Sequence, residues 1–482
     1  MIIRAEKAFI NGNFQNNVTL AIHRGVFEDP VTLLKPKDKS LDFNIIVPGF
    51  IDAHTHLWQY GLFISRPNLK ETRSIKETLE FIESIVKSGA YRPPIIFEEF
   101  DQSNWQEKRF ITKKELDRVT GTVPVILRRV CGHIAIANTA ALRLIPSKTA
   151  GVDKKSGLLL EEVPLRINDY FPPDFEDIKL AILSAQDRML SLGITSVHEF
   201  GGPDIFKAYE ELASADLLKI RIYFNFYERD IKKIIDLGLK TGFGNNILRI
   251  GGIKVFMDGS VGGKTAAFFE NYVGEKHNGK LLKSQEEMEK LITTAQDHGI
   301  QLLVHAIGTK AIRTALLAFK NALAGGNYLR HRIEHFEFPE EQDLKLASSM
   351  GILISSQPNF ITRWGGVEGM YYEFLGENRW RINNPFRKML KYGLKVAFGS
   401  DAMPPSPSYG IKGAVRHPVQ ENSISFEKAV ELYTEMGAFF SFEEDIKGKI
   451  QRGLFADFVV IDKVSPDFNV QSVFINGIRV SG

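Results

Sequence analysis

The sequence has little of several features, and each shortage excludes a class of protein. Among 482 residues the only cysteine is Cys131, which excludes an internal disulfide and a cysteine-rich zinc site. No run of about 18 apolar residues occurs, so no membrane-spanning helix is expected. Charged residues interrupt the first segment before an apolar stretch forms, so no secretory signal is predicted. We therefore expect a cytoplasmic protein.

An excess of charge of one sign is also missing. The chain has 61 Lys and Arg against 58 Asp and Glu, a formal net charge of +3. This balance gives no reason to expect a nucleic acid or a membrane surface as partner. Hydrophobic residues make up 44% of the chain, which is typical of a globular protein with a large core. The length suggests about three domains, or one large barrel with additions.

The two ends of the chain carry the same short pattern. Phe-Ile-Asn-Gly occurs at residues 9–12 and again at residues 474–477. Asn-Gly between alternating apolar residues predicts a tight β-hairpin, because both turn positions need a positive φ. We predict one small β-sandwich domain formed from residues 1–47 and 447–482, in preference to two unrelated surface hairpins.

Between the ends, short apolar strands alternate with helical stretches. This alternation predicts βαβ units and a parallel sheet, and eight strands favour a (β/α)₈ TIM barrel of the α/β class. The first barrel strand is expected within residues 48–66 and the rest of the barrel within 176–446. Residues 67–175 lack this alternation of strands and helices. This predicts that they form an inserted α+β subdomain, which would serve as a lid over the substrate. The candidate strands are 45–51, 194–197, 220–225, 248–256, 301–304, 332–335, 352–355 and 396–399.

Several potential metal ligands fall at the ends of these strands. His54 and His56 are two residues apart, so on a strand both imidazoles project to the same side and can share one ion. His305 ends the apolar run 301–304, His335 ends the segment 332–334, and Asp401 follows the segment 396–400. Each lies at the carboxyl end of a predicted strand, where barrel active sites lie. Core packing rarely places so many such residues at strand ends. The sequence therefore predicts a metal centre.

Lys254 lies inside an otherwise apolar strand. An unpaired buried ammonium is costly, so either its pKa falls or its charge is removed. One interpretation is an ion pair, with Asp258 as the nearest candidate. The other is that its neutral amine takes up carbon dioxide, and the resulting carbamate bridges two metal ions.

The chain resembles the amidohydrolase superfamily, and within it amidohydrolase family 3, the YtcJ-like branch. The resemblance extends over almost the whole chain and keeps the family's order. It is carried by PGFIDAHTHL (48–57), GITSVHEFG (193–201), IKVFMDGSVGGKTAAF (253–268), VHAIGTKAI (304–312), RIEHFE (332–337) and FGSDAMP (398–404).

The resemblance implies a centre of two divalent ions, expected to be Zn²⁺. It implies that His54, His56 and Asp401 hold one ion, and that His305 and His335 hold the second. Lys254, N6-carboxylated, would bridge the two, and Asp401 would also act as general base. Members of the superfamily often assemble as dimers or larger oligomers, which makes a homo-oligomer an expectation.

Substrate contacts are predicted from the remaining polar positions. In the insertion, His133 and Asn138 match a Gly-His…Asn segment of this branch, and local backbone contacts are an equal alternative for them. His198, Gln357 and Trp364 follow or end strands and are further candidates. A hydrogen bond that supports the metal ligands is an equal alternative for His198, and solvation of a loop is the alternative for Gln357 and Trp364. Two positions depart from the branch, which commonly has Asp where this chain has Cys131 and Thr309. Neither departure touches a predicted ligand.

These observations predict a metal-dependent hydrolase that acts on a non-peptide C–N bond of a small molecule, in an amide, formamide or cyclic amide. Phe100, Trp105 and Ile134 in the insertion suggest a substrate with an apolar part. The alternatives are an ester or lactone hydrolase with the same site, and a catalytically inactive scaffold. A phosphate-binding loop before Lys264 is excluded, because its first glycine is replaced by Asp258.

Overall fold

The computed structural model describes residues 1–29 and 40–482; residues 30–39 of the predicted N-terminal β segment lie outside the described part. The described chain divides into two compact units. One comprises Met1–Leu57 and Gln186–Gly482, and the other comprises Trp58–Ala185.

The first unit contains an eight-stranded parallel sheet whose strands follow one another in chain order. Its two edge strands are also joined, because the amide N–H groups of Ser400 and Asp401, just after the last strand, donate to the carbonyl oxygen of His54 within the first strand at 3.2 and 2.8 Å. The sheet thus closes as the predicted TIM barrel. Its strands are β5 (Phe50–Thr55), β11 (Ile194–Gly201), β12 (Arg221–Tyr227), β13 (Leu248–Phe256), β14 (Gln301–Ala306), β15 (Arg332–His335), β16 (Leu353–Ser356) and β17 (Val396–Phe398).

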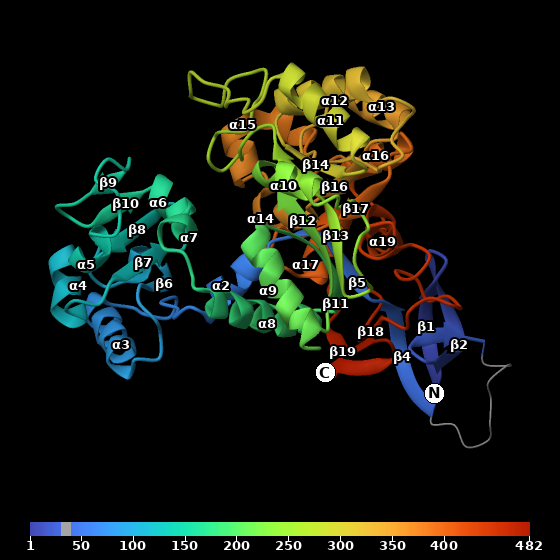
Figure 1. Cartoon of the computed structure of the whole chain (residues 1–482), viewed down its shortest axis with the longest axis horizontal. Helices are drawn as coiled ribbons and strands as arrows, with labels where there is room; N and C mark the ends of the chain where they lie inside the picture. The colour runs from blue at the N-terminus through green and yellow to red at the C-terminus, as the bar shows by residue number, and fades with distance from the viewer. Residues whose placement is uncertain (30–39) are drawn as a thin grey trace. The chain divides into compact units, whose positions relative to one another are not determined.

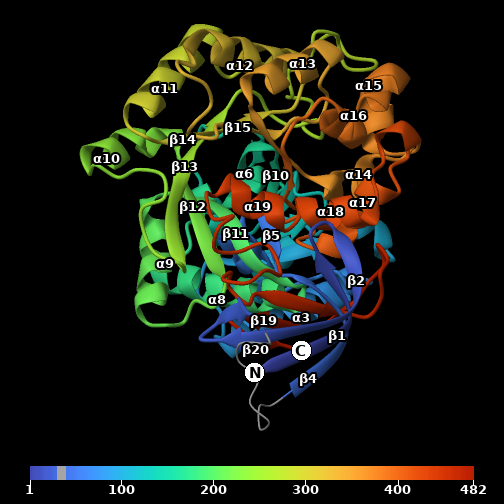
Figure 2. The same ribbon diagram turned by 90° about the vertical axis from the view of Figure 1, so that its right-hand side faces the viewer.

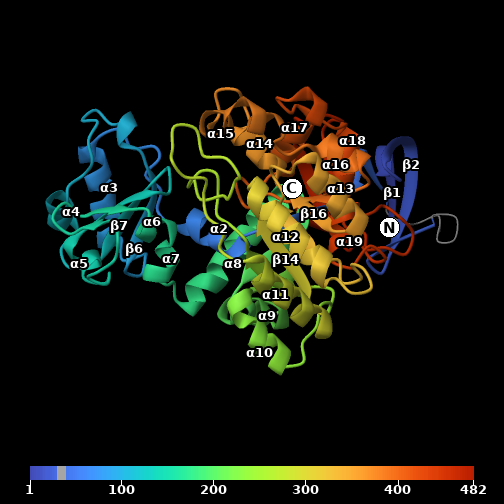
Figure 3. The ribbon, with the colours of Figure 1, turned by 90° about the horizontal axis from the view of Figure 1, so that it is seen from above.

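Helices connect these strands and surround the sheet (Figures 1 and 3). Helix α11 (Gln285–Asp297) shows how the sequence sets their ends, since Ser284 before its first residue and Glu287 in its first turn form a capping box. Helix α8 (Phe175–Ser191) passes from the second unit into the first. The others are α9 (Pro203–Ser214), α10 (Ile231–Asp236), α11 (Gln285–Asp297), α12 (Thr309–Ala322), α13 (Glu341–Met350), α14 (Pro358–Trp364), α15 (Met370–Arg381), α16 (Phe386–Lys391), α17 (Pro407–Val415), α18 (Phe426–Leu432) and α19 (Glu435–Phe440).

Both ends of the chain enter one seven-stranded sheet (Figure 2), in the order β20-β19-β18-β4-β1-β2-β3. Both Asn-Gly hairpins are confirmed: φ is 51° and 78° at Asn11 and Gly12, and 52° and 73° at Asn476 and Gly477. The shared β unit is therefore present, while its arrangement as a sandwich stays a prediction. The strands are β1 (Ile2–Ile10), β2 (Asn13–His23), β3 (Val26–Glu28), β4 (Ser40–Pro48), β18 (Phe458–Ile461), β19 (Val470–Ile475) and β20 (Ile478–Ser481).

The predicted strand 45–51 is wrong, because it joins two strands of different sheets. Strand β4 ends at Pro48 in the terminal sheet, and the barrel strand β5 begins at Phe50. Gly49 lies between them, where a Cβ would be 2.2 Å from the Oγ1 atom of Thr195. Because residues 45–51 form a continuous apolar run, the sequence does not show where the chain passes from one sheet to the other. Only glycine, which has no side chain, fits at this point.

The second unit has its own five-stranded sheet and its own core. The strands, in the order β6-β7-β8-β10-β9, pair mostly antiparallel. Phe100 and Trp105 are buried at its centre with ring centroids 5.7 Å apart. They are core residues, so the inference of an apolar substrate from them is wrong. The elements are β6 (Ile95–Phe100), β7 (Val125–Arg129), β8 (Ile134–Ala137), β9 (Val152–Asp153), β10 (Leu158–Leu160), α2 (Leu57–Ser65), α3 (Ile75–Ser88), α4 (Lys113–Thr120), α5 (Thr139–Leu142), α6 (Glu162–Leu165) and α7 (Ile167–Tyr170).

Within residues 1–29 and 40–482, no helix combines the length and the apolar character that crossing a membrane requires.

A buried ion pair fastens the barrel to the terminal sheet. Arg221 on β12 donates to both carboxylate oxygens of Asp457, at 2.7 and 3.0 Å, and both side chains are almost fully buried. We expect Asp457→Asn to lower the free energy of unfolding by roughly 3–5 kcal/mol, because it leaves the Arg221 charge buried without its partner. Urea unfolding measures this change. The exposed partner of Arg416 provides the control, since Asp467→Asn is expected to leave the unfolding midpoint nearly unchanged.

Candidate metal centre

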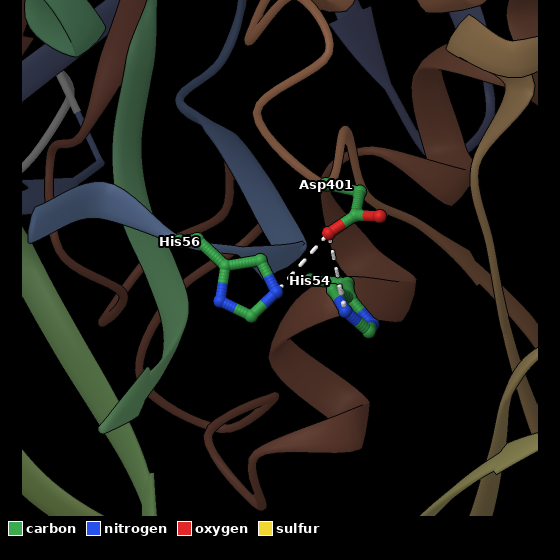
Figure 4. Close-up of side chains that lie close together, drawn as sticks. All are labelled: His54, His56 and Asp401. Carbon is green, nitrogen blue, oxygen red and sulfur yellow. Dashed lines mark ion pairs between the residues drawn. The ribbon is translucent and has the colours of Figure 1, made fainter. Parts of the chain in front are cut away.

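Three of the predicted ligands lie together at one mouth of the barrel. His54 is in β5, His56 follows that strand, and Asp401 follows β17. Asp401 Oδ1 lies 3.2 Å from His56 Nε2 and 3.6 Å from His54 Nε2. Figure 4 shows the carboxylate facing both rings. Within the described residues, these three form the one group whose ligand atoms all lie within 4.8 Å of one another.

Lys254 reaches this group from β13. Its Nζ lies 3.3 Å from His54 Nε2 and stands over the rings of Phe200 and Phe256. Burial lowers the pKa of Lys254 to about 8, although the charges of Glu334 and Asp401 oppose this shift. The amine thus loses its proton far more readily than an exposed lysine.

An ion pair between Lys254 and Asp258 is not formed. The carboxylate of Asp258 instead accepts hydrogen bonds from the main-chain N–H groups of Ala267, Ile307 and Gly308, at 2.9, 3.1 and 2.9 Å. Asp258 therefore organises the loops that follow β13 and β14, and the prediction of Asp258 as the partner of Lys254 is wrong.

His305 and His335 lie beside the first group. Their ring centroids are 4.4 Å apart, and the ring of His335 is 4.8 Å from that of His54. His305 Nε2 lies 3.1 Å from the carbonyl oxygen of Gly259, so it donates there and leaves Nδ1 with a free lone pair. The Nδ1 atom of His335 is buried with no hydrogen-bond partner. Two imidazole lone pairs are therefore available for a second ion.

The backbone at two of these positions is in the left-handed region. φ is 71° at His335 and 52° at Asp401. The N–H of Phe336 donates to the carbonyl of Glu334, two residues back, which closes a γ-turn around His335. Neighbouring strand residues normally face opposite sides of a sheet, and this turn lets Glu334 and His335 serve the same site. Such strain in residues other than glycine is typical of functional sites.

The donor set fits divalent metal ions. Burial lowers the pKa of His54 to about 4 and that of His305 to about 3, and the Lys254 charge acts in the same direction. Burial also lowers the pKa of His335 well below its usual value. All three imidazoles are therefore neutral at pH 7, as metal ligation requires. Burial raises the pKa of Asp401, but the hydrogen bond with His56 and the charges around it prevail and lower it to about 2.

The predicted substrate residues of the barrel have different surroundings. His198 is buried on β11, and its Nδ1 accepts from Arg332 at 2.8 Å. Gln357 donates to Ser355, but its Oε1 atom is buried and has no partner. Trp364 packs against Phe360, with ring centroids 4.9 Å apart. Their contact with a substrate stays a prediction, for which the free oxygen of Gln357 is the strongest support.

In the second unit, the polar atoms of Asn138 are all used within the unit. Its oxygen accepts from the N–H groups of Val125 and Ala141, and its amide donates to Thr120 and Val123. This is the local backbone alternative. His133 is partly exposed and pairs with Glu161 at 2.9 Å.

Two acidic residues that support the ligands were not singled out in the sequence. Glu334 accepts a short hydrogen bond from His54 Nδ1. Asp52 accepts from the N–H groups of His54 and Ser400, at 3.2 and 2.8 Å, and from the Ser400 hydroxyl. Burial raises the pKa of Asp52 to about 7. The signal for both was available, since each is a charged residue inside a strand that is buried along its whole length.

Comparison with known proteins decides the family. Residues 44–478 match the model of the amidohydrolase family. The chain belongs to this family. The Bacillus subtilis (strain 168) protein YtcJ, named as an amidohydrolase, is 27% identical over 458 residues, which cover 88% of this chain and 84% of YtcJ. The N-substituted formamide deformylase of Arthrobacter pascens is 26% identical over 466 residues, with 87% and 83% covered.

A solved structure agrees with this assignment. The crystal structure of a metal-dependent hydrolase from Pyrococcus furiosus has a TM-score of 0.84 and 26% identity, and the likeness covers 97% of this chain and 100% of that one. The amidohydrolase family and this relative point to a hydrolase that uses a divalent metal. The barrel mouth described above supplies the residues for it.

Proposed function

We propose that this amidohydrolase is a cytoplasmic enzyme that hydrolyses a non-peptide C–N bond of a small molecule, in an amide, formamide or cyclic amide. The observation that carries the proposal is the meeting of His54, His56 and Asp401 at the barrel mouth, with Lys254 within 3.3 Å of His54. Two divalent ions, preferably Zn²⁺, would be held there, one by this group and one by His305 and His335.

The residues have separate roles in the proposed reaction. Bound divalent ions would lower the pKa of a water molecule and polarise the substrate carbonyl. Asp401 accepts the proton of that water and later delivers it to the leaving nitrogen. The neutral amine of Lys254 could add carbon dioxide with release of one proton, and the resulting carbamate would supply carboxylate ligands beside His54. Phe256, whose ring lies 5.2 Å from that of His305 and is 39% exposed, offers an apolar wall beside them.

The choice of a C–N bond draws on the relatives. One is named an N-substituted formamide deformylase, and formamides are therefore the first substrates to test. An ester or lactone hydrolase is the second candidate, because the same site would serve an acyl–oxygen bond. An inactive scaffold is disfavoured, because all six predicted ligands are present at strand ends.

The first test is the metal content per chain, by elemental analysis of protein purified without chelators and with bicarbonate. We expect about two ions per chain, since the site has two sets of imidazole ligands. The loaded protein is then assayed with N-substituted formamides, amides, cyclic amides and lactones. Turnover of lactones alone would move the function to the second candidate. No bound metal after reconstitution would favour the scaffold.

A further inference from the structure

A chain of buried polar residues lies behind His54. Glu334 links His54 to Arg332. Its Oε2 accepts from His54 Nδ1, and its Oε1 accepts from Arg332 Nε at 2.6 Å. Arg332 also donates to His198 Nδ1 at 2.8 Å and to the carbonyl oxygen of Ala53 at 3.1 Å. All of these side chains are at most 1% exposed.

The strand geometry explains how the chain of contacts crosses the barrel. Arg332 and Glu334 are two residues apart on β15, so both point to the same face. Ala53 immediately precedes His54 on β5, so Arg332 ties β15 to the strand that carries the ligand. Burying Arg332 and Glu334 is costly, and a fixed, fully bonded pair is what makes it tolerable. Packing alone would be served better by apolar residues.

The chemistry of the contacts fixes the state of the His54 ring. A carboxylate only accepts, so the proton of the neutral imidazole is held on Nδ1. The lone pair on Nε2 then faces Asp401 and Lys254. The ion pair with Arg332 accounts for the other oxygen of this carboxylate.

We infer that Glu334, Arg332 and His198 are positioning residues that hold His54 in the tautomer and orientation needed to bind the metal. The inference rests on the proposed metal centre. It favours the supporting role of His198 over a substrate contact, since His198 accepts from Arg332 and stops that side chain from turning away. None of the three residues touches the reacting atoms.

The test is Co²⁺ binding to the whole chain, measured by chelator competition and by the visible absorption of bound Co²⁺. Glu334→Gln has nearly the same size, but its amide can donate to Nδ1 and so favours the wrong tautomer. We expect it to weaken binding by about 10–100-fold and to change the absorption spectrum. Glu334→Asp, which keeps the carboxylate, is expected to recover part of the affinity.

The matched control is a second buried arginine–carboxylate pair, between Arg221 and Asp457. Asp457→Asn breaks this pair where β12 begins, at the opposite end of the barrel strands from the ligands, and we expect wild-type Co²⁺ affinity and spectrum despite its lower stability. Should Glu334→Gln not fold, Arg332→Lys serves instead, since an ammonium cannot reach His198, Glu334 and Ala53 together. Unchanged affinity and spectrum in the Glu334 variant, with normal binding by the wild-type chain, overturns the positioning role alone. Absence of binding by the wild-type chain overturns the metal centre, and the positioning role with it.

Discussion

Replacing Asp401 with asparagine is expected to abolish turnover and to leave the fold intact. Asparagine has the same shape, and the hydrogen bond from the main-chain N–H of residue 401 to His54 does not depend on the side chain. The variant loses the group that accepts the proton of water and returns it to the leaving nitrogen. General acid–base catalysis contributes about 10²–10⁴-fold, so a fall in kcat of at least this size is expected.

Steady-state kinetics with the best substrate from the screen, together with metal content and circular dichroism, make this prediction decisive. A variant that keeps its metal and its fold but loses kcat identifies Asp401 as the base. A variant that loses metal as well identifies it first as a ligand. Asp467→Asn, which alters an exposed aspartate paired with Arg416, is expected to retain wild-type kcat. A residual kcat within tenfold of wild type would remove Asp401 from the role of base.

The barrel and the positions of its ligands could be predicted because both depend on local patterns. Strands buried on both faces read as apolar runs, and a polar residue that ends such a run must lie at the barrel mouth. His54 and His56 followed from the two-residue period of a strand. Their binding of metal is still a prediction, although the geometry supports it.

Other features could not be predicted, because they depend on contacts between distant segments. The γ-turn at His335 interrupts the alternation of side-chain directions along β15, and the sequence has no typical turn residue there that would predict it. The partnership of Glu334 with His54 joins residues 280 positions apart. Gly49 lies where the chain passes from the terminal sheet to the barrel. The need for glycine there comes from the close approach of Thr195, which the sequence does not show.

The insertion shows the opposite case, in which residues of types that often contact substrates have structural partners instead. Asn138 has the residue type of a substrate contact, but the same amide caps a short helix and joins two segments of backbone. Trp105 has the type of a lid residue, yet it lies at the centre of its own core. A side chain that can serve either role is assigned only when its partners are known.

Lys254→Ala is expected to lower the metal content from about two ions per chain to about one. The lysine is fully buried among His54 and two aromatic rings, with a lowered pKa and no carboxylate within hydrogen-bond distance. A buried ammonium without such a partner is costly, whereas a carbamate would be an anionic ligand for the proposed ions. Removing it deletes a ligand from both ions, and the one held by fewer residues should leave first.

Chemical rescue separates the carbamate from a merely structural lysine. The cavity left by Lys254→Ala is lined by potential metal ligands, so formate, acetate or propionate can enter it and supply the missing carboxylate. We expect each to restore part of the activity and the second ion. Lys447→Met is the matched control, because Lys447 is equally buried but pairs with Glu443 at 2.7 Å, and its loss should leave the metal content unchanged. Two ions per chain in Lys254→Ala without any added carboxylate would show that the lysine bridges nothing.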